Sequence, residues 1–269
     1  MSVSKVRKFL YVVGAFCILL SGCTFIDTAI EKASEVAGEI VGESVGKSLG
    51  KASLRGISPA MRQIYVSSVF NAFFYGGGYQ FDYHEYKPGE WTKWEVTGMD
   101  EGDEFEKAFL KKDDKGREWW RIYTSNVTEG EAEEVVLEAL FSEPDKSGGR
   151  KLLRMRGIFP GDKEPGEIPV QENTSAWYRE PVQLTDESMK AAEKGMETIA
   201  TPAGKFKTRH LVYKTIDGRY DWWLSDKVPG GMVKYSITYG EGGNGGEKDA
   251  YTSQIVAYGS GAKSRLGSF

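Results

Sequence analysis

Residues that can act as nucleophiles, bases or metal ligands are scarce in this chain. Its 269 residues include two cysteines, Cys17 and Cys23, and two histidines, His84 and His210. Neither histidine has a second histidine near it in sequence with which it could form a metal-binding pair. The sequence also lacks a P-loop and an HExxH motif. We therefore expect a protein that is not an enzyme, with no catalytic residue, no metal site and no cofactor.

The chemistry that the sequence does favour is modification of the thiol of Cys23. Cys23 ends the short run Leu20-Ser21-Gly22-Cys23. Ahead of it lie a basic segment at residues 5–8 and an apolar run at residues 9–20, which is too short to span a bilayer as a helix. This is the layout of a secretory signal that ends in small residues and a cysteine.

The segment resembles the bacterial lipoprotein signal, in which the cysteine is diacylated, the peptide is cut before it and the new amino terminus is acylated. The resemblance implies that residues 1–22 are a signal peptide and that Cys23 carries palmitate-type chains. Several chains on one residue anchor a protein firmly, because each buried methylene contributes about 0.8 kcal/mol. A plain signal peptide or an N-terminal anchor helix is the alternative interpretation.

The residue after Cys23 indicates which membrane would hold the lipid anchor. Enterobacterial lipoproteins retained at the inner membrane resemble one another in having Asp at this position, whereas this chain has Thr24. We therefore expect anchoring in the outer membrane, with the domain facing the periplasm. Exposure on the cell surface, in a cell with one membrane, is the alternative.

Composition indicates a domain held together by its core. Without residues 1–22 the chain keeps one cysteine, so no disulfide can form within it. Seven Trp, fourteen Tyr and thirteen Phe supply a large aromatic content for burial. The formal net charge is −4, and an acidic chain without a basic cluster is a poor binder of nucleic acid. Nucleic acid is therefore excluded as an expected partner.

Residues 23–57 are predicted to tether the domain to the membrane. Four glycines recur at a spacing of four and would share one ridge of a membrane-proximal helix, here called the glycine ridge: Gly38, Gly42, Gly46 and Gly50. This spacing lets a second helix backbone approach closely. The stretch resembles the glycine zippers of bacterial outer-membrane lipoproteins, which implies self-association or docking on an envelope protein. A flexible Gly/Ser-rich linker is the alternative.

Residues 58–262 are predicted to form a β-rich domain, followed by a flexible tail at 263–269. Ser58 and Pro59 are typical of a helix start, and a second helix is predicted from Thr185 to a stop at Gly195. Alternating hydrophobicity predicts about ten strands. They lie near residues 81–86, 91–97, 105–111, 119–124, 135–141, 151–159, 205–215, 219–225, 232–239 and 251–258.

Turns with Gly and Pro at 112–116 and 228–231 separate neighbouring strands. Successive strands with short connections predict an antiparallel meander. The expected fold is therefore mainly β (α+β), an antiparallel curled sheet or half-open barrel with one or two covering helices, preceded by the tether helix.

Tryptophans are the candidate residues for a ligand or partner surface: Trp91, Trp94, Trp119, Trp120, Trp177, Trp222 and Trp223. They could line the concave face of a curled sheet and hold an acyl chain or glycan, or they could form an ordinary core. Neighbours in sequence, as at 119–120 and 222–223, point to opposite faces of a strand. One of each pair therefore lies outside the main core unless both faces are covered.

The meander, the two helices and the lipid anchor together resemble the lipoprotein-carrier type of half-open β-barrel, which handles acyl chains in the bacterial envelope. Segments 201–206 and 223–231 resemble a recurrent pattern of uncharacterised β-rich envelope proteins. Two functions remain open: binding of a hydrophobic envelope component in the curled sheet, or a scaffold that assembles through the glycine ridge. An enclosed apolar cavity would favour the first function, and a filled core the second.

Overall fold

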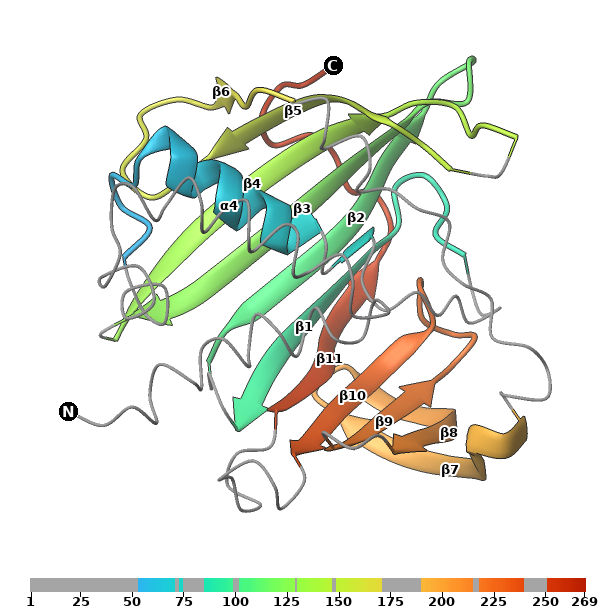
Figure 1. Ribbon diagram of the computed structural model, residues 1–269. Coiled ribbons are helices and arrows are strands. Elements are labelled where there is room, and N and C mark those ends of the chain that lie inside the picture. The colour runs from blue at the N-terminus through green and yellow to red at the C-terminus, as the bar shows by residue number, and fades with distance from the viewer. Residues whose placement is uncertain are drawn as a thin grey trace.

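The structure, a computed structural model, describes residues 53–70, 73–74, 85–98, 102–128, 130–146, 149–170, 190–214, 218–239 and 251–269 (Figure 1). The predicted lipidation site Cys23, the glycine ridge and Trp177 lie outside these ranges. Within these ranges no helix has the length and apolar character needed to cross a membrane.

Eleven strands of the described chain form one antiparallel sheet. They are β1 (Trp91–Gly98), β2 (Glu104–Lys112), β3 (Glu118–Thr128), β4 (Glu131–Phe141), β5 (Leu152–Ile158), β6 (Gly166–Glu167), β7 (Glu193–Thr201), β8 (Gly204–Lys214), β9 (Gly218–Leu224), β10 (Met232–Tyr239) and β11 (Tyr251–Gly259). Their order is β6-β5-β4-β3-β2-β1-β11-β10-β9-β8-β7, so β6 and β7 are end strands and the sheet is open. The predicted class, a mainly β fold with a curled antiparallel sheet, is confirmed.

The sheet is built outward from its centre. β1 to β6 follow one another toward one edge, and β11 back to β7 follow one another toward the other. The two halves meet where β1 pairs with β11, from Trp91 opposite Gly259 to Gly98 opposite Tyr251. β1–β6 are called the first half below, and β7–β11 the second half.

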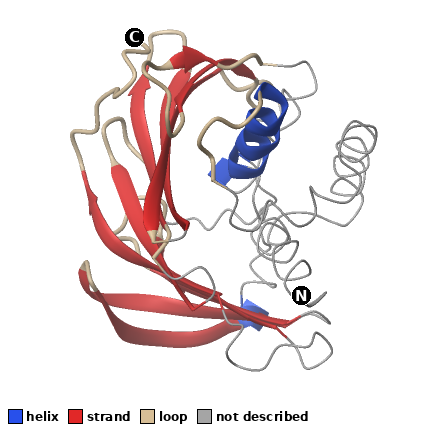
Figure 2. Cartoon of the chain, turned by 90° about the vertical axis from the view of Figure 1, so that its left-hand side faces the viewer, coloured by secondary structure: helices blue, strands red, loops and turns tan. Residues whose placement is uncertain are grey.

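The helix α4 (Pro59–Phe70) lies inside the curve of the sheet, against the first half (Figure 2). Ser58 caps it, because its Oγ accepts a hydrogen bond from the N–H of Met61 at 3.3 Å, as the sequence predicts. Val66 and Phe70 are fully buried. The ring centroid of Phe70 lies 6.1 Å from that of Phe141 on β4, so the helix is held to the sheet by aromatic packing.

Two apolar clusters fill the concave side. The first-half cluster joins α4 to β2–β5, and includes Trp120, Ile122 and Leu137. The second-half cluster joins β1, β2 and β8–β11, and includes Trp94 and Trp222. Because the half-buried Phe73 packs against both, the clusters meet beside the end of α4.

The helix predicted to run to Gly195 is wrong at its C-terminal end. Residues 190–192 are helical, and β7 begins at Glu193. Gly195 has a φ of +115° and lies at a register shift between Glu193 and Gly195, so it serves a β-bulge and not a helix stop. The apolar residues Met196 and Ile199 are three apart, a helical spacing, which explains why the sequence pattern did not reveal this strand.

The structure also differs from the flexible tail predicted at 263–269. Leu266 and Ser268 are buried, with 6% and 4% of their surface exposed. These residues pack on the convex side of the sheet, where the carboxylate of Glu138 on β4 binds their backbone and hydroxyl groups. A buried carboxylate needs such donors, and the nearby chain supplies them.

An ion pair holds the first turn of α4 to the loop after β5. The two terminal guanidinium nitrogens of Arg62, Nη1 and Nη2, donate to the carboxylate of Asp162, at 2.8 and 2.7 Å. The hydrogen bonds from Arg62 are the main reason why the pKa of Asp162 lies below its usual range. The hydrogen bond from the N–H of Phe159 lowers this pKa further. The resulting stabilisation is present above the unfolded pKa of aspartate, about 4, and is lost as the pH falls through the folded value.

We therefore expect Asp162→Asn to lower the free energy of unfolding by about 1 kcal/mol at pH 7, since the pair is partly exposed. The loss should shrink as the pH falls through the lowered pKa of Asp162, because the wild-type carboxylate then becomes protonated. Urea unfolding at a series of pH values checks this, with the exposed Glu164→Gln as the control. An equal loss at both ends of the series would contradict the assignment.

Candidate functional site

The six described tryptophans of the predicted surface are divided between the two faces. Trp94, Trp120 and Trp222 are buried in the concave clusters. Trp119 packs in a small convex cluster with the half-buried Trp91, and Trp223 is half-buried against His210. The structure therefore brings three of the predicted residues to one side of the sheet.

Buried aromatic packing continues across the two halves of the concave side. Trp94 stacks on Phe105 with ring centroids 5.2 Å apart, and Phe73 meets Phe105 edge to face at 5.4 Å. In the second half, the ring centroids of Trp222 and Tyr235 lie 5.4 Å apart. Because Phe73 packs against both clusters, this aromatic packing joins the first half to the second beside the end of α4.

Lys107 places a positive charge on this apolar side. It is half-buried on β2, and its Nζ donates a hydrogen bond to the carbonyl oxygen of Phe73 at 2.9 Å. The Nζ atom also lies 4.5 Å from the ring centroid of Phe74, 4.9 Å from that of Trp120 and 5.6 Å from that of Tyr86. The ammonium group is thus held by three aromatic rings and one backbone oxygen.

No ion pair joins Lys107 to a carboxylate within the part of the chain that the structure describes. Burial lowers the pKa of Lys107 to about 8, and the carboxylate of Glu118 opposes that shift. Glu118 itself is paired with Arg150 at 2.7 Å and with Lys112 at 3.4 Å. Its charge is therefore committed to other cations, and the ammonium of Lys107 lacks a dedicated counter-ion.

Tyr86 adds a second polar group beside Lys107. Its hydroxyl is buried and has no hydrogen bond of ordinary geometry to any described residue. Burial raises the pKa of Tyr86, and the nearby hydroxyl of Thr92 opposes the shift. Gly230, with a φ of +78°, lies against the ring, since a Cβ there would come 2.5 Å from Tyr86 Cε2. The ring of Tyr86 is thus held in place beside Lys107.

The convex side carries a network of charged residues under residues 263–269. Glu138 is fully buried and accepts hydrogen bonds from Ser264 Oγ and the N–H of Arg265, both at 2.6 Å. Arg121 pairs with Glu106 at 2.7 Å and also donates to the carbonyl oxygen of Lys263. Glu138 and Arg121 thus hold residues 263–269 on the convex face, which indicates a structural role for this network.

His210 lies in a second polar group on the second half. Its Nδ1 is 2.9 Å from Glu197 and its Nε2 is 2.6 Å from Asp221. Its ring stacks on Trp223 with centroids 4.5 Å apart, and Arg219 also binds Asp221. Both ring nitrogens of His210 therefore have partners. The described residues contain no group of three or more side chains suited to hold a metal ion.

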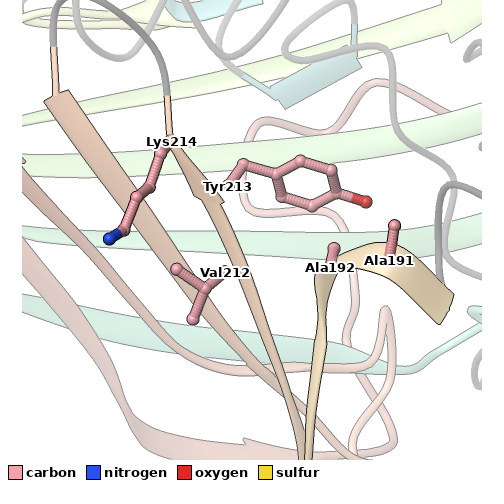
Figure 3. A pocket seen from close by; sticks show the side chains of 5 residues that line it. All are labelled: Ala191, Ala192, Val212, Tyr213 and Lys214. Carbon is pink, nitrogen blue, oxygen red and sulfur yellow. The ribbon is translucent and has the colours of Figure 1, made fainter.

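Two shallow pockets are lined by described residues. One, of about 260 Å³, lies where β8 passes the helical turn before β7. Figure 3 shows Tyr213 reaching from β8 toward Ala191 and Ala192, while Lys214 points the other way. The second, of about 310 Å³, lies in the loop between β4 and β5. Neither is lined by a tryptophan, so neither is the enclosed aromatic cavity that a carrier would favour.

Sequence analysis missed Lys107 and Tyr86 as candidate residues. A signal for Lys107 was present, because it stands between Phe105 and Phe109 in a strand whose inward positions are otherwise apolar. Glu138 had a similar signal, because both faces of its strand are apolar. Tyr86 had none, because its position depends on the approach of Gly230, far away in sequence.

Comparisons with known proteins place the chain in no family. No protein-family model matches it, and no curated protein matches it. Among solved structures it is similar to MucB in a crystal structure of MucB in complex with MucA(peri). That likeness has a TM-score of 0.34 and 9% sequence identity, and covers 68% of this chain and 54% of the other. The chain thus spans about half of that structure, and a likeness at this level supports no functional assignment.

Proposed function

We propose that this chain is a lipid-anchored protein of the bacterial cell envelope that binds a hydrophobic component, an acyl chain or an acylated protein, in its curled sheet. The observation that carries the proposal is the aromatic packing on the concave side, which continues past the end of α4 and lies near Lys107, a lysine that forms no ion pair with a described carboxylate. The lipoprotein-like signal that ends at Cys23, together with the neighbouring Thr24, supports anchoring in the outer membrane, facing the periplasm. A binding role, and not catalysis, fits the sequence.

A scaffold function through the glycine ridge is the second candidate. One observation favours it: α4 packs into the first half so closely that Val66 and Phe70 are fully buried, which is a filled core. In that case the β domain would present its surface to an envelope protein and hold no lipid. The two candidates differ in whether an acyl chain reaches the concave tryptophans.

Quenching of tryptophan emission by a brominated fatty acid tests this difference. The full chain is anchored in vesicles of unbrominated lipid and titrated with the fatty acid. One double variant, Trp94→Phe with Trp222→Phe, removes concave reporters. The matched variant, Trp119→Phe with Trp223→Phe, removes convex ones. We expect strong quenching in the wild type and the second variant, and weak quenching in the first, because bromine quenches only at close range.

Equal quenching in the two variants, or no quenching, would contradict lipid binding in the sheet and favour the scaffold. Recovery of the chain in the soluble fraction, before it is mixed with vesicles, would contradict the lipid anchor at Cys23.

A further inference from the structure

We infer that residues 263–269, called the strap below, are exchanged between two copies of this chain, so that the convex face of each copy binds the strap of the other. The partner that this face fits is thus a second copy of the chain. The inference goes beyond the proposed function, because it needs neither a hydrophobic ligand nor the glycine ridge.

The first argument is that the convex face recognises the backbone of the strap. Carbonyl oxygens of the strap accept hydrogen bonds from three arginine side chains of β3 and β5: Arg121, Arg154 and Arg156. The carboxylate of Glu138 on β4 accepts from the N–H groups of Arg265 and Leu266, at 2.6 and 3.4 Å. All of these side chains belong to the first half, whereas the strap continues from β11 of the second half. They would bind the same segment equally well if it came from another molecule.

The second argument is that the face beneath the strap is charged. Glu106, Arg121 and Glu138 expose at most 5% of their surface while the strap is in place. A face that is always covered gains more from well-packed apolar residues than from buried ion pairs, whereas charged side chains also suit contact with water. Leu266 is the one buried apolar side chain of the strap, and it packs in a small cluster beside Tyr123. Release of the strap therefore uncovers little apolar surface.

The third argument is the form of the connection between β11 and the strap. Residues 260 and 261 are exposed, and Gly261 has a φ of +86°. A Cβ placed on Gly261 would meet no described atom within 4 Å, so the chain has room to turn there. A backbone hydrogen bond from the N–H of Ala262 to the carbonyl oxygen of Gly89 holds the connection in its present form. Because an exchanged segment makes the same contacts as before, a change of a few dihedral angles here passes the strap to the second copy.

Photo-crosslinking of two differently tagged full-length copies, produced together in one bacterial host, tests the exchange. In one copy p-benzoylphenylalanine replaces Phe269, because the ring of Phe269 lies 5.4 Å from that of Trp119 on β3. We expect irradiation of the isolated envelopes to join the two tags, with the crosslink at the convex face of the copy that lacks the probe. Mass spectrometry of the joined peptides locates the crosslink.

Leu266→Asp in the probe-bearing copy should lower the yield of the product between copies about tenfold, since burial of a leucine side chain corresponds to more than one decade of affinity. Lys263→Gln in the same copy is the matched control, because Lys263 is an exposed residue of the strap, and should leave the yield unchanged. Glu138→Gln in the copy without the probe should also lower the yield, because it weakens the receiving face. Circular dichroism checks that each variant is folded.

Two results would overturn the exchange. Crosslinks found only within the probe-bearing copy would show that each strap stays on its own convex face. An unchanged yield between copies after Leu266→Asp would show that the two chains are merely close together in the membrane.

Discussion

Glu138→Ala is expected to lower the free energy of unfolding by about 3 kcal/mol, because the carboxylate makes several charge-assisted hydrogen bonds at a fully buried position. It accepts from Ser264 Oγ, from the N–H of Arg265 and, at 3.4 Å, from the N–H of Leu266. Without these bonds residues 263–269 should leave the convex face. Urea unfolding measures the loss, and hydrogen exchange at Arg265 and Leu266 should accelerate.

Glu131→Ala is the matched control, since Glu131 is an exposed glutamate on the same strand, β4. It should change the stability by less than about 0.5 kcal/mol. The role assigned to Glu138 would be rejected if Glu138→Ala unfolded at the wild-type urea concentration and the two amides stayed protected.

Trp222→Ala should destabilise the protein by about 4 kcal/mol, whereas Trp223→Ala should cost about 1 kcal/mol. Trp222 is 5% exposed and packs edge to face on Tyr213 at 5.2 Å and against Tyr235 at 5.4 Å, so truncation leaves a cavity in the second-half cluster. Trp223 is half-buried on the opposite face, where its loss removes the stacking on His210.

The two variants are compared by urea unfolding followed by far-ultraviolet circular dichroism, so that each serves as the control for the other. Similar losses of unfolding free energy in Trp222→Ala and Trp223→Ala would mean that the convex face is packed as tightly as the concave one. That result would contradict the division of the sheet into a core side and a polar side.

Much of the fold could be predicted locally. Alternation of apolar residues located β3, β4 and β10, and Ser58 with Pro59 marked the start of α4. The turn at 112–116 is confirmed by Asp113, which accepts hydrogen bonds from the N–H groups of Lys115 and Arg117. These features depend on residues close in sequence, which is why a sequence pattern reveals them.

β7 and the order of residues 263–269 could not be predicted in this way. The bulge at Gly195 breaks the alternation of β7, and residues 263–269 show no strand or helix period of their own. Their order depends on Glu138, more than a hundred residues earlier in the chain. Composition alone therefore suggested flexibility where long-range hydrogen bonds hold the chain.

By itself, the sequence determined the mainly β class, the alternation that sends adjacent tryptophans to opposite faces, and the prediction of lipidation at Cys23. Only the tertiary structure decided that β11 pairs with β1, that α4 packs against the first half, and that Lys107 faces aromatic rings and forms no ion pair with a described carboxylate. The physical reason is that periodicity reports which side of a strand is apolar, whereas the identity of its neighbours depends on contacts between distant segments.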